Sequence, residues 1–238
     1  ANSTGSKTEP YKRQTPEELE ADIADYLAEE VIARQTPDMQ LFLLHTSVLE
    51  RMDESLCRHL MQSEDGQLLH RAVQSGLFLI PLDQERRWFR YHHMFGRLLY
   101  RRLTRQYANI VPELHLRASQ WFRSNGYIVE AIEHTIAAAD YPAAAELILQ
   151  EASELLRNEM HMLLRWFGQF PERLIDQNPA LAVLYAWSLA TFERLEQAES
   201  VLDRTEPYLD EGQAGSLNGE DIRGYFSGMR CLICLHRN

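Results

Sequence analysis

The sequence predicts a mainly α-helical chain, in which a winged-helix domain with a β-hairpin wing is followed by an α-solenoid of antiparallel helix pairs. Helix-start signals recur through the first part of the chain. Residues 77–95 then combine an apolar run, a charged turn and an aromatic strand, the pattern of a wing hairpin. After about residue 105 apolar positions recur only at helical spacing, which indicates stacked helices and no further strand.

The elements of the winged helix follow in the expected order. A capping-box pattern with proline at the first helical position, Thr15-Pro16-Glu17-Glu18, predicts a first helix that continues to Ile32. Thr36 and Pro37 predict the start of a second helix by the same reasoning, and Asp53 is expected to cap a third. A fourth helix should end at Gly76, before a hairpin whose turn spans residues 83–87. A further helix then opens at His92 and His93.

In the second part of the chain, proline-containing helix starts divide the sequence into short helices. Asp140 and the following Tyr-Pro predict a helix over residues 143–156, and Pro171 should end the one after it. Asn178-Pro179 begins a helix over residues 180–192. We therefore expect three segments: a flexible N-terminal segment (residues 1–15), a linker helix with the winged-helix domain (16–108), and a helical-repeat domain (109–238).

Composition excludes several classes of protein. The formal net charge of −11 argues against a chain that binds nucleic acid as a whole. No apolar run is long enough to span a bilayer, and residues 1–7 lack the apolar region of a signal peptide, so they resemble a linker or a cloning remnant. Three cysteines give no disulfide framework and suit a reducing cytoplasm. We expect a cytoplasmic protein without membrane contact.

His92 and His93 are the sharpest candidate site residues. Backbone N–H groups at a helix N-terminus favour negative charge, so paired imidazoles there could face a phosphate. The alternative is structural: His92 packs against the wing or caps its helix. The residues by themselves leave both interpretations open.

Several segments together resemble the large ATP-dependent LuxR-type transcription regulators, the MalT-like branch of the STAND ATPases. The similarity extends over approximately residues 20–210. The segments that carry it are residues 25–31, 42–49, 77–99, 131–134 and 137–140, with Ala144 and Ala145. Glycine often occupies the inter-helix turn of that family, where this chain has Glu193, which argues against a left-handed conformation there.

The resemblance implies a segment from the middle of a longer regulator, with a TPR-like sensor solenoid after the winged helix. Such proteins carry a P-loop ATPase before this segment and a DNA-binding helix-turn-helix after it. Because these 238 residues contain no G-x-x-x-x-G-K-[ST], ATP or ADP would be held by the neighbouring ATPase domain. The family implies that His92 contacts the terminal phosphate of ADP, with His93 a weaker candidate. It also implies an inducer or regulatory protein on the solenoid, and self-association on activation.

Charge and cysteine patterns each have a simpler interpretation. Residues 17–30 hold seven acidic side chains and no basic one, whereas residues 86–105 hold seven arginines. Arg97, Arg101 and Arg105 form one helical stripe, either a DNA contact or, as we favour, a solvated or interdomain face that meets the acidic helix. Cys231 and Cys234 form a lone C-x-x-C, too few ligands for structural zinc.

No catalytic constellation is recognisable, so we expect a non-enzymatic regulatory segment without a cofactor or metal of its own. The alternative function is a free-standing helical-repeat interaction scaffold. Most of the aromatic and methionine side chains after residue 109 should form the core of the solenoid: Trp121, Phe122, Met160, Met162, Trp166, Phe167, Tyr185 and Trp187.

Overall fold

The structure, a computed structural model, describes residues 30–63, 66–209, 216–217 and 220–236. The chain divides into two compact units, Ala1–Ala108 and Asn109–Asn238. We describe each unit by itself. The predicted first helix lies mostly outside the described residues, of which residues 30–33 are helical.

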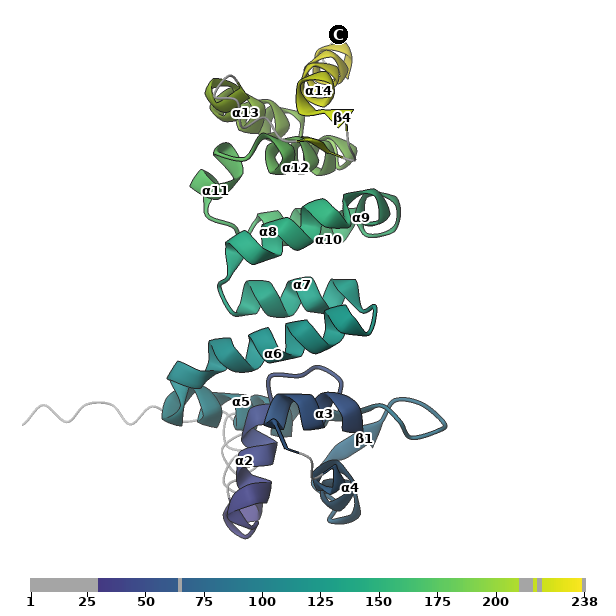
Figure 1. The fold of residues 1–238 in the computed structure, drawn as a ribbon, viewed down its shortest axis with the longest axis vertical. Coiled ribbons are helices and arrows are strands. Elements are labelled where there is room, and N and C mark those ends of the chain that lie inside the picture. Colours follow the sequence, from purple (N-terminus) through teal and green to yellow (C-terminus); the bar gives the residue numbers. More distant parts are fainter. Residues whose placement is uncertain (1–29, 64–65, 210–215, 218–219, 237–238) are drawn as a thin grey trace, which may run out of the picture. The chain divides into compact units, whose positions relative to one another are not determined.

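The first unit is a winged helix (Figure 1). The hairpin strands pair antiparallel, with Leu79 opposite Tyr91 and Pro81 opposite Phe89. The helix–helix–helix–hairpin–helix order confirms the predicted fold. Its elements are α2 (Pro37–Thr46), α3 (Glu54–Met61), α4 (Gln67–Gln74), β1 (Leu79–Pro81), β2 (Phe89–Tyr91) and α5 (His93–Gln106).

Side-chain caps fix where these helices begin. The Thr36 hydroxyl accepts a hydrogen bond from the Met39 N–H at 3.4 Å, and the Asp53 carboxylate accepts one from the Leu56 N–H at 2.7 Å. Gly76, with φ of +66°, follows the end of α4, while the Leu77 N–H donates to the carbonyl of Ala72. These predicted starts and this predicted end are confirmed.

A residue outside the hairpin also pairs with its second strand, which the sequence did not predict. Met52, just before α3, exchanges both backbone hydrogen bonds with Phe89 of β2, at 2.8 and 2.9 Å. At the hairpin tip, the Asp83 carboxylate accepts hydrogen bonds from the N–H groups of Arg87 and Trp88. The wing is therefore held at its base and at its tip.

The second unit is a succession of short helices in which consecutive or near-consecutive helices pack together (Figure 1). This arrangement confirms the predicted α-solenoid of antiparallel pairs. Its helices are α6 (Val111–Ser124), α7 (Ile128–Ala137), α8 (Tyr141–Gln150), α9 (Ala152–Asn158), α10 (Met160–Phe167), α11 (Glu172–Asp176), α12 (Pro179–Thr191), α13 (Leu195–Thr205) and α14 (Ile222–His236). Single 3₁₀ turns occupy Ala108–Ile110 and Glu206–Leu209.

Three of the turns between helices in the second unit share the same backbone conformation and hydrogen-bond pattern. Gly126, Ala139 and Glu193 follow α6, α7 and α12 with φ values of +80°, +59° and +59°. In each turn the next N–H donates back to a carbonyl in the last helical turn, as Arg194 does to Leu189 at 2.9 Å. The expectation that Glu193 avoids the left-handed conformation is therefore wrong. The two hydrogen bonds that close the turn offset the steric cost of a side chain there.

Two further expectations need correction. The helix predicted over residues 143–156 breaks at Glu151 into α8 and α9, and the break allows Ala152 and Leu155 to be buried. In addition, the expectation of no strand after residue 105 is wrong, because β3 (Ser216–Leu217) pairs with β4 (Glu220–Asp221).

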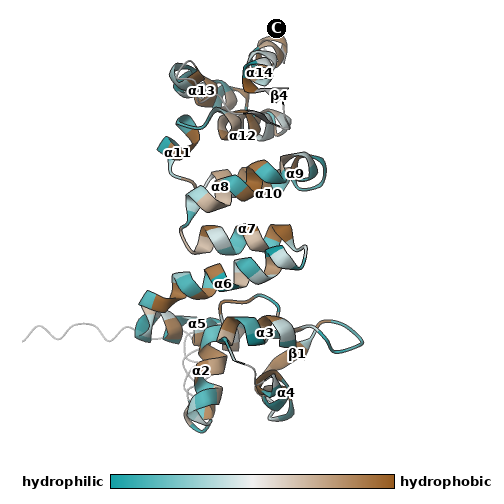
Figure 2. Cartoon of the chain, in the orientation of Figure 1, coloured by the Kyte–Doolittle hydropathy of each residue, from teal (hydrophilic) through white to brown (hydrophobic). Residues whose placement is uncertain are grey.

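The core of the second unit centres on α10 and α12. Residues 180–184 of α12 are all buried, as expected of a helix covered on nearly every side. Figure 2 shows hydrophobic segments on both helices. Trp166 and Phe167 of α10 belong to the same buried cluster. Of the predicted core residues, Trp121, Phe122, Trp166 and Phe167 are buried, whereas Trp187 is 39% exposed.

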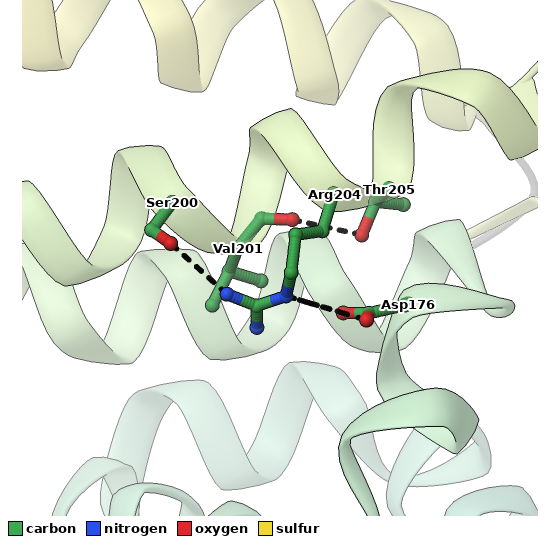
Figure 3. Close-up of polar contacts among 5 residues, drawn as sticks. All are labelled: Asp176, Ser200, Val201, Arg204 and Thr205. Atoms are coloured by element: carbon green, nitrogen blue, oxygen red, sulfur yellow. Dashed lines mark hydrogen bonds and ion pairs between the residues drawn. The ribbon is translucent and has the colours of Figure 1, made fainter.

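At the edge of this core an ion pair joins α11 to α13. The Arg204 Nε donates to the Asp176 carboxylate at 3.1 and 3.3 Å, and a second guanidinium nitrogen donates to the Ser200 hydroxyl at 3.0 Å (Figure 3). The Thr205 hydroxyl donates to the carbonyl of Val201 within α13. One N–H, shared between the two oxygens of Asp176, thus ties the end of the five-residue α11 to α13, while Ser200 holds the guanidinium from within α13. None of the described helices is long and apolar enough to cross a membrane.

Candidate functional site

His92 lies between β2 and α5, where it is the N-cap residue of α5 rather than the first helical residue that we expected. Its backbone is held on both sides. The His92 N–H donates to the carbonyl of Phe78 at 2.8 Å, and the His92 carbonyl accepts from the Gly96 N–H at 2.9 Å. The helix therefore starts at a position fixed by Phe78, the residue just before β1.

The imidazoles of His92 and His93 are exposed. The His92 ring makes no capping hydrogen bond to α5, and it stands edge-on to the His93 ring with centroids 4.5 Å apart. The first turn of α5 contains no acidic residue. The positive end of the helix dipole and two N–H-bearing rings thus share one exposed surface, a suitable environment for an oxyanion. His92 does not cap α5 through its side chain, which removes one of the structural alternatives.

Tyr91 anchors the residue before His92 inside the unit. Its hydroxyl lies 2.7 Å from the Thr46 hydroxyl, which itself donates to the carbonyl of Phe42. Because the Thr46 proton is used there, the Tyr91 hydroxyl must donate to Thr46. Burial raises the pKa of Tyr91 well above its ordinary value, so the phenol stays protonated.

An aromatic cluster lies beneath the same position. Phe95 packs against Tyr91 and Phe78, with ring centroids 5.8 and 5.0 Å apart. Phe78 has φ of +54°, a strained value for a bulky residue, and it is the residue whose carbonyl holds His92. A Cβ at Gly96 would come within 3.3 Å of the Tyr91 Cβ, so the close approach favours glycine. Thr46 and Phe78 lie within the segments 42–49 and 77–99, but sequence reasoning gave neither a role, because only the tertiary structure brings them to Tyr91 and His92.

We expect Tyr91→Phe to lower the free energy of unfolding by about 1 kcal/mol, because the Thr46 hydroxyl loses its buried donor. Thr46→Val should cost a similar amount, and the double variant less than the two together. Urea denaturation would measure the effect. The matched control is Tyr100→Phe, in which the hydroxyl of a 38% exposed residue is removed. Equal losses of unfolding free energy in Tyr91→Phe and Tyr100→Phe would contradict the buried hydrogen bond from Tyr91 to Thr46.

Helix α5 has an apolar face and a positively charged face, as predicted. Phe95, Leu98, Leu99 and Leu103 are buried, whereas the arginine stripe at 97, 101 and 105 is exposed. Burial raises the pKa of the Cys57 thiol well above its ordinary value, which disfavours a reactive thiolate. Within the described ranges, no three side chains that could ligate a metal ion lie together.

A buried histidine pair in the second unit was not anticipated. The Nδ1 atoms of His115 on α6 and His134 on α7 lie 2.8 Å apart, so one ring donates and the other accepts. Burial lowers the pKa of His115 to about 4 and that of His134 to about 3. Next to them, the Ser119 hydroxyl bonds to Thr135 at 2.7 Å. Both rings occupy apolar helix faces, and only the α6–α7 packing brings them together.

Comparison with known proteins agrees with this architecture. Residues 28–111 match the family model of the MalT winged helix domain. The chain is 32% identical over 216 residues to the HTH-type transcriptional regulator MalT of Yersinia enterocolitica, a match that covers 90% of this chain and 24% of that regulator. It is 33% identical over 212 residues to the serine/threonine-protein kinase PknK of Mycobacterium tuberculosis, covering 88% of this chain and 19% of the kinase.

A solved structure has the same fold. It is a Signal Transduction ATPase with Numerous Domains (STAND) protein with a tetratricopeptide repeat sensor from Pyrococcus horikoshii, which matches with a TM-score of 0.60 at 14% identity. The match covers 90% of this chain and 34% of that one. The chain spans about a fifth to a quarter of the length of the curated relatives. Residues 28–111 are a MalT winged helix domain and a helical-repeat segment follows it, so the chain is similar to one segment of the longer MalT regulators.

Proposed function

We propose that this chain couples nucleotide state to inducer state within a longer, ATP-dependent transcription activator. In this proposal a neighbouring ATPase domain binds ATP or ADP, and the winged helix reports which of them is bound. The helical-repeat unit would receive a small-molecule inducer or a regulatory protein, and self-association would follow activation. Support comes from the similarity to MalT and from the shared fold of the STAND protein with a repeat sensor.

His92 is the residue proposed to sense the nucleotide. The observation that carries this role is its placement: an exposed imidazole at the acid-free start of α5, on a backbone held by Phe78 and Gly96. A phosphate oxygen of ADP would accept a hydrogen bond from the ring N–H and be favoured by the helix dipole. Release of that contact would shift the balance between two domain arrangements. His93 lies beside it and would contribute less.

The decisive experiment replaces His92 by Ala in the full-length parent protein. We expect ADP affinity to fall roughly tenfold, the effect of losing one hydrogen bond to a charged group. Basal promoter activity should rise, because the ADP-bound resting state is weakened. Isothermal titration with ADP and a reporter assay would measure the two effects.

His70→Ala is the matched control, since His70 is another exposed histidine of the same unit, on α4. It should leave both quantities unchanged. If His92→Ala is folded and keeps wild-type ADP affinity and basal activity, His92 is not the sensor. The reading frame of the parent protein tests the scaffold alternative. A P-loop before this segment and a helix-turn-helix after it support the regulator, whereas their absence leaves a helical-repeat interaction scaffold.

A further inference from the structure

A cavity of about 420 Å³ lies within the first unit, away from His92. It opens between the N-terminal end of α3, the helix α4 and the tip of the wing hairpin. Its volume falls in the range of small-molecule pockets. Neither His92 nor His93 lines it, so whatever it binds is independent of the nucleotide-sensing role proposed above.

The base of this cavity is apolar and rigid. Leu69 is 4% exposed and Phe89 is 8% exposed, while Val73 is half-buried beside them. Phe89 is fixed because both of its backbone groups bond to Met52. An aromatic or aliphatic group placed on this base would be removed from water without any rearrangement of the backbone.

The rim of the cavity carries cations from two different elements. Arg58 comes from α3 and Arg86 from the hairpin tip, and both side chains are exposed. Within the described part of the chain, the structure shows no ion pair for either of them. Arg87, by contrast, pairs with Asp83 and Glu85. Arg86 is also held in place, because its N–H donates to the Asp83 carbonyl and its φ is +52°.

Two carboxylates lie at the same rim and limit what can bind. The Asp53 carboxylate is occupied by the Leu56 N–H, and that of Glu54 lies against Gly66. Because Arg87 is already paired, two guanidinium groups, those of Arg58 and Arg86, remain to bind a ligand at the opening. A single carboxylate can bind between these two guanidinium groups, whereas a polyanion would also be repelled by the carboxylates of the rim.

We propose that this cavity is a binding site for a small amphipathic carboxylate, with its apolar body on Leu69, Val73 and Phe89 and its oxygens between Arg58 and Arg86. A planar guanidinium matches a carboxylate through paired N–H donors, so the two arginines can share one head group. Bound in this way, the ligand would join the wing to α3 and stabilise the winged-helix unit.

The probe for this site is phenylpropionate, titrated into the whole chain at pH 7.5 and low salt. Calorimetry would give the affinity, and amide chemical shifts would locate the ligand. We expect binding with shifts at Leu69, Val73 and Phe89. Acetate, which lacks the apolar body, and phenethylamine, which reverses the charge, should each bind at least about tenfold more weakly. If phenethylamine bound as tightly as phenylpropionate, the cavity would not be selective for a carboxylate and the proposal would be overturned.

Substitutions then test the rim. Arg58→Gln and Arg86→Gln should each weaken phenylpropionate binding about threefold or more, the effect of losing one partly screened charge contact. Arg90→Gln is the matched control, because Arg90 is an exposed arginine of the same hairpin that does not line the cavity. No measurable binding, or equal losses in all three variants, would overturn the proposal. Loss of binding in His92→Ala instead would place the ligand at the start of α5 and equally exclude this cavity.

Discussion

Replacing Trp166 by Ala is expected to lower the free energy of unfolding by about 3–5 kcal/mol. Trp166 is 1% exposed and is among the largest fully buried side chains in the described residues. Its removal would leave a cavity between the helices of the second unit, because neighbouring side chains collapse only partly into such a space. The loss should lie toward the lower end, since the indole N–H finds no hydrogen-bond partner among the described residues and its burial already carries a cost.

Trp187→Ala is the matched control for this experiment. Trp187, on α12, is 39% exposed, so its truncation should cost less than about 1 kcal/mol. Trp166→Phe should fall between the two, because it keeps most of the buried area and removes the unpaired N–H. Urea denaturation followed by circular dichroism would give the three values. Similar losses for Trp166→Ala and Trp187→Ala would show that the α10 core is not packed as described.

Acidification is expected to destabilise the chain well before its carboxylates titrate. Burial lowers the pKa of His115 and His134, so both rings are neutral in the folded state at pH 5. In the unfolded chain they regain an ordinary pKa near 6.5. Unfolding therefore takes up protons as the pH falls below about 6.5, and the stability present above that value is lost. Between pH 7.5 and 5 the loss should be on the order of 2 kcal/mol for each histidine.

Denaturation midpoints measured across this pH range would test the prediction. His134→Gln retains a hydrogen-bonding side chain and should reduce the pH dependence by about half. His161→Gln is the control, because His161 is an exposed histidine on α10 of the same unit. A stability that stays level from pH 7.5 to 5, or a slope that His134→Gln leaves unchanged, would contradict the role of the buried pair.

Local signals were sufficient for most helix boundaries. Thr36, Asp53 and Asn178 each accept a hydrogen bond from the N–H three residues on, because capping depends on short-range geometry. Local sequence signals did not predict the helix break at Glu151 or the turn at Glu193, because tertiary packing and backbone hydrogen bonds determine them. The break at Glu151 lets Ala152 and Leu155 enter the core, and the left-handed turn at Glu193 is held by hydrogen bonds that sequence does not reveal.

The sequence by itself determined the fold class, the order of the elements from α2 to α5 and the place of His92 at the start of α5. Those features depend on periodicity, caps and turns within a few residues of one another. Only the tertiary structure decided which distant side chains come together: Thr46 bonds to Tyr91, His115 bonds to His134, and Arg58 and Arg86 line one cavity. These residues are far apart along the chain, and tertiary packing rather than local pattern places them near one another.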